Sequence, residues 1–286
     1  MNAGSRYAVF AACQHDESPF VEMAACLYSH PRWRRWVGDA HKFGPHVTVR
    51  GVFELAGAYS EWARAVTAVA CRQAPIPLGS PRLVDRFPAG VAVTYRTSAE
   101  AQARLARLVV EIAEVTRPFV GRSQVTADEV AETRAAVRGM GGLADRSSVL
   151  LQRLAEVERR VVDATLPPLP TAPEYRLPLL IQLWDRPARR DALLRYGDPL
   201  VVDFQAHLTL LTLGPGVPPG DLQVELESRR PGTFDGNDLM LRLYLMAEDP
   251  TRTVPVVEHD MLRDRHLYAD RPGWRVEQRI PLGDGS

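Results

Sequence analysis

Two short stretches of the sequence carry side chains that could do acid–base chemistry together. The strings FGPHVTVR and FQAHLTLL each contain a His, an apolar residue, a Thr and a second apolar residue. Side chains alternate between the two faces of a β-strand, so we expect His46 and Thr48 to share one face, and His207 and Thr209 to share the corresponding face of another strand. An imidazole beside a hydroxyl can hold a small anion and move protons on it.

The repetition of this pattern argues against coincidence. With average residue frequencies, two full matches among the seven His arise in about two sequences in a hundred. Both copies also have a Phe three residues before the His (Phe43 and Phe204), in surroundings typical of strands. One such His alone would be read as a buried, hydrogen-bonded histidine, whereas the matched pair favours a functional site.

The two motifs resemble those of the 2H phosphoesterase superfamily, whose members carry one His-x-Thr/Ser-x motif in each lobe of a pseudo-symmetric α+β fold. That group includes RNA 2′,3′-cyclic phosphodiesterases, 2′-5′ RNA ligase-like proteins and nucleotide cyclic phosphodiesterases. The longer strings FGPHVTVRGVFEL and RYGDPLVVDFQAHLTL also resemble a bacterial branch sometimes encoded beside phosphonate-utilisation genes. The resemblance covers roughly residues 6–115 and 176–262. The two motifs are farther apart in this sequence than in compact members of the superfamily. The additional residues fall in the middle of the chain.

The resemblance implies a bilobal α+β fold with antiparallel sheets lining a central cleft, plus a helical insertion. We place the first lobe at 1–116, the insertion with its Pro-rich connector at 117–175, and the second lobe at 176–286. The insertion is expected to be a lid, a dimer contact or an elaboration without a functional role.

The activity implied is metal-independent hydrolysis of a cyclic phosphate, with no cofactor. One neutral His would take a proton from the attacking water while the other, protonated, donates to the leaving oxygen. Thr48 and Thr209 would donate hydrogen bonds to the non-bridging oxygens. Sequence does not say which His is the base.

Arg50 is an even number of residues from His46, so it is expected on the same strand face; it is either a phosphate clamp or a solvated strand-end residue. Tyr244 is either a stacking partner for a base or a core aromatic.

Two other functions stay open at this stage. The first is RNA end processing of the 2′-5′ ligase type, with an RNA terminus as partner; the second is a non-catalytic nucleotide-binding module. The chain has 35 basic and 35 acidic residues, which disfavours binding that depends on many phosphate contacts.

The three cysteines of the chain form no C-x-x-C pair, and no metal-ligand spacing occurs among the histidines. With no signal peptide and no long apolar run, we expect a soluble cytoplasmic protein whose oligomeric state is open.

Sequence patterns also predict the elements that must position the motifs. Strands are expected over 6–13, 46–55, 82–87, 90–95, 177–184, 200–213, 239–246 and 254–261, the last two as a closing hairpin. Helices are expected after 18, 60, 98 and 148, and over 126–138, 188–195 and 221–229, with Thr126 and Glu129 forming a capping box. The polar tail after Arg271 is expected to be peripheral.

Overall fold

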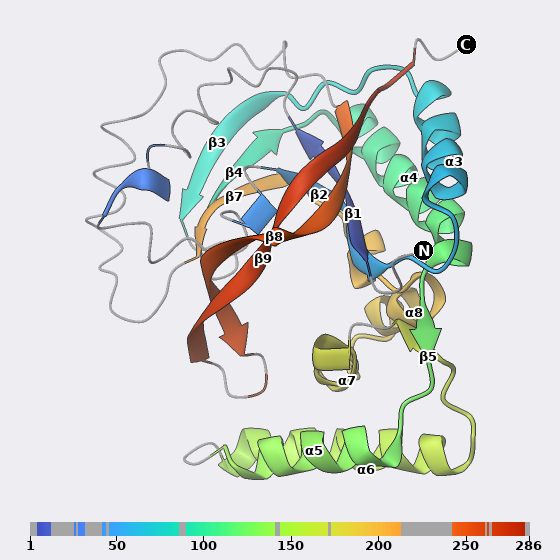
Figure 1. The fold of residues 1–286 in the computed structure, drawn as a ribbon, viewed down its shortest axis with the longest axis vertical. Helices are drawn as coiled ribbons and strands as arrows, with labels where there is room; N and C mark the ends of the chain where they lie inside the picture. The colour runs from blue at the N-terminus through green and yellow to red at the C-terminus, as the bar shows by residue number, and fades with distance from the viewer. Residues whose placement is uncertain are drawn as a thin grey trace.

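In the described part of the chain, the computed structural model contains two larger antiparallel sheets and one short strand pair (Figure 1). The structure describes residues 5–12, 26, 28–31, 42–43, 46–85, 90–140, 144–170, 173–212, 242–260, 262 and 265–283. The larger sheet has the strand order β2 (Val47–Glu54), β1 (Arg6–Ala12), β8 (Arg242–Asp260), β9 (Arg265–Pro281). The smaller sheet has the order β3 (Ser80–Asp85), β4 (Gly90–Arg96), β7 (His207–Thr212). The α+β class with antiparallel sheets is therefore confirmed.

Each sheet combines strands from both halves of the chain. β8 from the C-terminal half pairs with β1, and β7 pairs with β4. The predicted division into a lobe before residue 117 and a lobe after residue 175 therefore does not coincide with the sheets.

Helices α3 (Tyr59–Cys71) and α4 (Ala99–Thr116) pack on one face of the larger sheet. Figure 1 shows them side by side next to β1. The core between helices and sheet holds fully buried residues from both, including Val9, Val49, Trp62, Leu105 and Leu245.

The middle of the chain forms a separate group of helices. The helical unit consists of α5 (Ala127–Arg138), α6 (Ala144–Val162) and α7 (Pro173–Gln182), which share a second apolar core. It is reached through η2 (Arg117–Phe119) and the short pair β5 (Arg122–Ser123) and β6 (Leu169–Pro170). α8 (Pro187–Tyr196) and η3 (Pro199–Val201) then lead to β7. Leu262, in the turn between β8 and β9, packs into the core of the helical unit and ties the long β-ribbon to it.

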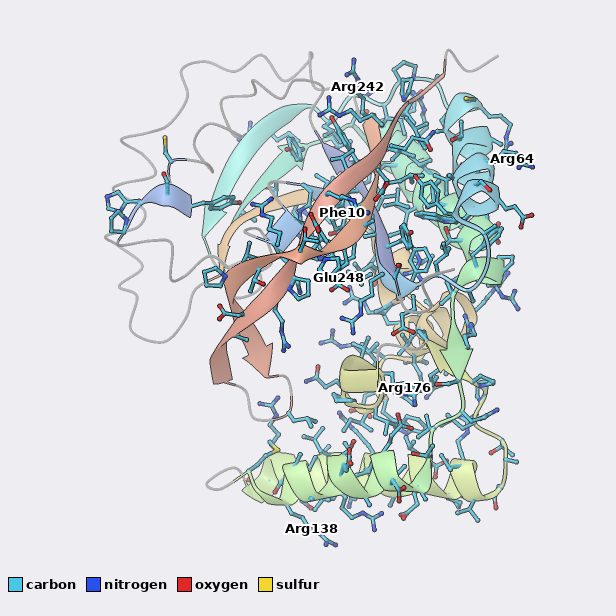
Figure 2. The ribbon with its side chains drawn as sticks, in the orientation of Figure 1. Phe10, Arg64, Arg138, Arg176, Arg242 and Glu248 are labelled. Carbon is cyan, nitrogen blue, oxygen red and sulfur yellow. The ribbon has the colours of Figure 1, made fainter. Side chains whose placement is uncertain are left out.

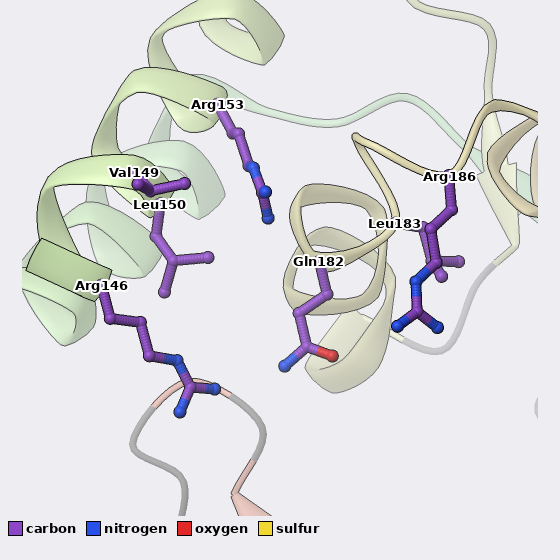
Figure 3. A pocket seen from close by; sticks show the side chains of 7 residues that line it. All are labelled: Arg146, Val149, Leu150, Arg153, Gln182, Leu183 and Arg186. Carbon is purple, nitrogen blue, oxygen red and sulfur yellow. The ribbon is translucent and has the colours of Figure 1, made fainter.

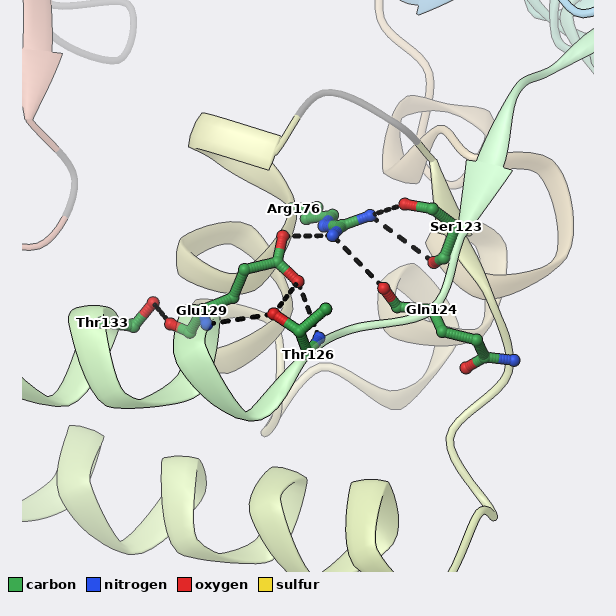
Figure 4. A network of polar contacts seen from close by, with 6 residues as sticks. All are labelled: Ser123, Gln124, Thr126, Glu129, Thr133 and Arg176. Carbon is green, nitrogen blue, oxygen red and sulfur yellow. Dashed lines mark hydrogen bonds and ion pairs between the residues drawn. The ribbon is translucent and has the colours of Figure 1, made fainter.

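A buried arginine joins α7 to the start of α5 (Figure 4). Arg176 donates to the side chain of Ser123, to the carbonyl of Gln124 at 3.4 Å and to the carboxylate of Glu129. Glu129 also accepts from the backbone N–H of Thr126 at 2.7 Å, which completes the predicted capping box. The helix ends at Arg138, as predicted. Burial raises the pKa of Glu129, but the hydrogen bonds from Thr126 and Arg176 outweigh it, so that pKa lies below its ordinary value.

The predicted strand over 177–184 is wrong, because this segment belongs to α7, which includes Pro178. Leu177, Leu180 and Ile181 are buried at helical spacing against α5 and α6. A short, nearly continuous apolar run fits a buried strand and a buried helix equally well, so the packing partners decided the outcome.

The predicted closing hairpin is also wrong. Residues 242–260 form one 19-residue strand, and its partner is the tail that was expected to be peripheral, β9. β9 is an edge strand whose exposed residues are largely polar; Arg275, for example, pairs with Glu277 at 2.7 Å. An edge strand with a solvated face shows too few apolar residues for its pattern to be recognised.

The remaining elements differ from expectation mainly at their ends. Residues 199–201 are 3₁₀ rather than strand, so the second motif strand begins only at His207. The predicted helix over 221–229 and residues 239–241 lie outside the described residues. Of the helix expected after Ser18, only residues 26, 28 and 29 are described, and they are helical. No described helix is both long and apolar enough to cross a bilayer.

Candidate functional site

The first motif lies at the edge of the larger sheet, on the face opposite α3 and α4. Val47 and Val49 are buried in the core, as predicted, while Thr48 is half-buried and pairs with Phe10 of β1. Directly opposite residues of an antiparallel pair point to the same face, so Thr48 shares the face of Phe10. His46 precedes β2 and stacks on Phe10, with ring centroids 3.9 Å apart. The first His and Thr are therefore together on one face.

An aromatic cluster surrounds His46. Phe43 meets His46 edge to face at 5.2 Å and also contacts Phe10 and Trp274. Figure 2 shows Phe10 beside the β8–β9 ribbon, and β8 pairs with its strand β1. These contacts hold the imidazole in one orientation, because the ring is in contact with two others. Phe43, noted in the sequence three residues before His46, is thus in direct contact with that histidine.

Tyr244 belongs to the same buried cluster as Phe10. It lies opposite Phe10 in the pairing of β1 with β8, is 6% exposed and lies under the guanidinium of Arg279. Of the two readings given for Tyr244, the core aromatic describes its position, because little of its ring surface is open to a stacked base.

Arg50 does not share the face of His46 and Thr48, so the predicted parity is wrong. β2 has an irregular register against β1 between Thr48 and Arg50, which places one extra residue in β2 at that point. Such a bulge interrupts the alternation of faces. The Arg50 side chain is buried on the core side, where its guanidinium lies 5.1 Å from the centre of the Phe53 ring. Its complete burial contradicts the solvated strand-end alternative, and its position on the core side separates it from the face of His46 and Thr48.

Asp198 is the partner of Arg50 and was not identified from sequence. Its Oδ2 accepts from Arg50 Nη1 and from the backbone N–H of Gly51, both at 2.8 Å, and its Oδ1 accepts from the N–H of Leu200 at 2.8 Å. The Tyr196 carbonyl accepts a further bond from Arg50 at 3.2 Å. Both charged side chains are almost completely buried. This ion pair joins the first motif strand to the segment that leads into the second.

Gly197 allows the backbone after α8 to lie close to Arg50 and Pro170. It has a φ of +75°, and a Cβ there would come within 2.9 Å of Pro170 and 3.3 Å of the Arg50 guanidinium. The signal available in the sequence was the string Tyr-Gly-Asp-Pro, in which Gly ends α8 and Asp198 begins η3 as its N-cap.

The second motif begins β7, at the edge of the smaller sheet. In the pairing with β4, His207 lies opposite Thr94, and Thr209 opposite Ala92. His207 is half-buried, and its Nδ1 lies 2.9 Å from the carbonyl of Gln205. Because a carbonyl only accepts, Nδ1 carries the proton and Nε2 is the basic nitrogen of the neutral ring. Burial lowers the pKa of His207, and the bond to Gln205 opposes this shift only in part.

The two copies differ in the role of their aromatic residue. Phe43 contacts its histidine edge to face, whereas Phe204 packs against the core of α3 and α4. Its carbonyl accepts from the Gln102 side chain at 2.6 Å, which fixes the approach to β7 from α4.

The strands β2 and β7 lie against one another where the two sheets meet. The tertiary structure therefore brings the two motif strands together from distant parts of the sequence. Among the described residues, no group of three His, Cys, Asp or Glu side chains is arranged to hold a metal ion. Comparison with protein-family models and with curated proteins found no match to this chain.

Proposed function

We propose that this protein is a 2H-type phosphodiesterase that hydrolyses a small cyclic phosphate, such as a 2′,3′-cyclic nucleotide, with two histidines and no metal. The observation that supports the proposal is the contact between β2 and β7, because His46 directly precedes β2 and His207 begins β7. A general acid and a general base on separate strands can serve the attacking and leaving oxygens of one phosphorus at the same time.

We assign the general base to His207. Its lowered pKa favours the neutral ring at neutral pH, and the Gln205 carbonyl holds the proton on Nδ1. Nε2 then accepts the proton of the attacking water as the oxygen bonds to phosphorus. His46, held against Phe10, donates a proton to the oxygen that leaves when the P–O bond of the ring breaks. Thr48 and Thr209 hydrogen-bond the non-bridging oxygens, where charge accumulates.

The test is hydrolysis of a panel of 2′,3′-cyclic nucleotides, 1,2-cyclic sugar phosphates and oligonucleotides with cyclic ends, in the presence of a chelator. His46→Ala and His207→Ala should each lower kcat by about 10²–10⁴-fold, the usual contribution of a positioned acid or base. His30→Ala is the matched control, because His30 lies outside both motifs. Turnover that survives either motif substitution, or that disappears with the chelator, refutes the assignment. Nucleotide binding without turnover would instead favour a binding module.

A further inference from the structure

The segment that leads into β7 is tied to the start of α4 by one side-chain amide. Gln102 donates from this amide to the carbonyl of Phe204 at 2.6 Å, across 102 positions of sequence. Because a carbonyl only accepts, the amide nitrogen of Gln102 faces it. Gln102 has a fixed base, since its backbone N–H donates to the carbonyl of Ser98 at 2.8 Å and the Ser98 side chain caps α4.

The side chains of the same segment anchor its backbone to the core. Phe204 packs against the core of α3 and α4, and Ala206 is 3% exposed in that core, while Gln205 between them is exposed. Asp203, directly before Phe204, has a φ of 57°, a left-handed conformation that is uncommon outside glycine and that surrounding contacts must maintain. The chain is therefore held firmly just before the second histidine.

His207 takes its orientation from this backbone. Its Nδ1 lies 2.9 Å from the carbonyl of Gln205, the residue next to Phe204. β7 is held from the other direction by its pairing with β4, in which His207 lies opposite Thr94. The hydrogen bond made by one ring nitrogen sets the tautomer of a neutral imidazole. A rotation of the chain at Phe204 would turn the Gln205 carbonyl away from Nδ1 and so change which nitrogen of His207 is basic.

We propose that Gln102 is a positioning residue for His207. Its amide holds the carbonyl of Phe204, the adjoining carbonyl of Gln205 then faces Nδ1, and Nε2 is left as the basic nitrogen. Gln102 bonds to the backbone and does not act on the substrate. This role rests on the proposed function, in which His207 is the general base, but the tautomer of the ring is measurable without turnover.

Two substitutions of Gln102 and two controls test the proposal. Gln102→Met keeps the length of the side chain and removes the donor, and Gln102→Glu keeps its shape but places an acceptor against the carbonyl. Gln73→Met is the matched control, because the Gln73 amide donates to the carboxylate of Glu111 at 3.0 Å, at another place on α4. Gln182→Met is the second control, because Gln182 lines a cavity between α6 and the end of α7 whose described lining contains no residue of either motif (Figure 3).

Each variant is examined by NMR and by kinetics. The nitrogen NMR shifts of the His207 ring, assigned by their loss in His207→Ala, distinguish a proton on Nδ1 from a proton on Nε2 when the ring is neutral. We expect the Nδ1–H form in the wild type and in both controls, and a shift towards the Nε2–H form in both Gln102 variants. Turnover of a 2′,3′-cyclic nucleotide by these two variants should fall by about 10- to 10²-fold in kcat with KM near the wild-type value, the scale expected when a catalytic group is misplaced by about 1 Å.

An altered tautomer together with a lower kcat supports the proposal. Ring shifts that stay unchanged in both Gln102 variants overturn it, even where kcat and the melting temperature fall, because the residue is then only structural. A wild-type ring that carries its proton on Nε2, an equal change in the controls, or an altered tautomer with unchanged kcat overturns it as well. If the wild type turns over no cyclic phosphate while the Gln102 variants still alter the ring shifts, Gln102 orients His207 and the proposed phosphodiesterase function is what fails.

Discussion

Removal of the Asp198 carboxylate is the sharpest test of how the two motifs are held together. Asp198→Asn keeps the shape of the side chain but leaves the buried guanidinium of Arg50 without its counter-charge. The carboxylate accepts three hydrogen bonds, and both side chains of the pair are at most 3% exposed. Breaking one side of a buried ion pair costs about 3–5 kcal/mol, because the remaining charge stays desolvated.

That cost is measurable by thermal and denaturant unfolding. At about 2 °C per kcal/mol for a chain of this size, the melting temperature should fall by about 6–10 °C. Asp191→Asn is the matched control, since Asp191 pairs with Arg190 at the surface and its substitution should change the stability by less than about 1 kcal/mol.

The substitution should also affect the proposed activity. Asp198 fixes the segment that precedes β7, so its loss should reduce turnover of a cyclic phosphate even at temperatures where the protein remains folded. If Asp198→Asn unfolds with the same stability as Asp191→Asn, the ion pair does not join the two motif strands as described.

Three further outcomes are expected. The pKa of His207, followed by NMR, should lie below its ordinary value of 6.5 because burial disfavours the imidazolium. The unfolded chain then binds that proton more readily, so the stability contribution is intact above about pH 6.5 and is lost progressively as the pH falls below it. Thr126→Ala removes the cap of α5 and should destabilise the protein by about 1 kcal/mol in urea unfolding. Leu154→Ala opens a cavity in the fully buried core of the helical unit and should cost about 2–5 kcal/mol by the same assay.

The controls for these predictions come from neighbouring residues. Thr133→Ala removes only a bond from a hydroxyl to a carbonyl within α5 and should cost less than Thr126→Ala. Val162→Ala, at a position that is 79% exposed, should be close to neutral. A His207 pKa above 6.5, a fully tolerated Thr126→Ala, or equal effects at Leu154 and Val162 would contradict the corresponding argument.

Sequence by itself determined the local features whose causes lie within a few residues. Alternation in the first motif predicted that Val47 and Val49 are buried, and Thr126 with Glu129 predicted a helix start that depends only on adjacent hydrogen bonds. The periodic helix after Ser98 follows from the same short-range rules.

Only the tertiary structure decided the features that depend on distant partners. Arg50 left its expected face because a register irregularity in β2 and the carboxylate of Asp198, 148 residues away, placed it in the core. The apolar run around Leu177 became a helix because α5 and α6 supplied the surface for it to pack on. The polar tail became β9 because β8 offered unpaired backbone groups, and backbone hydrogen bonding does not depend on which side chains the strand carries. Side-chain patterns record which face of an element is buried, but pairing and register are set by contacts that no short window of sequence contains.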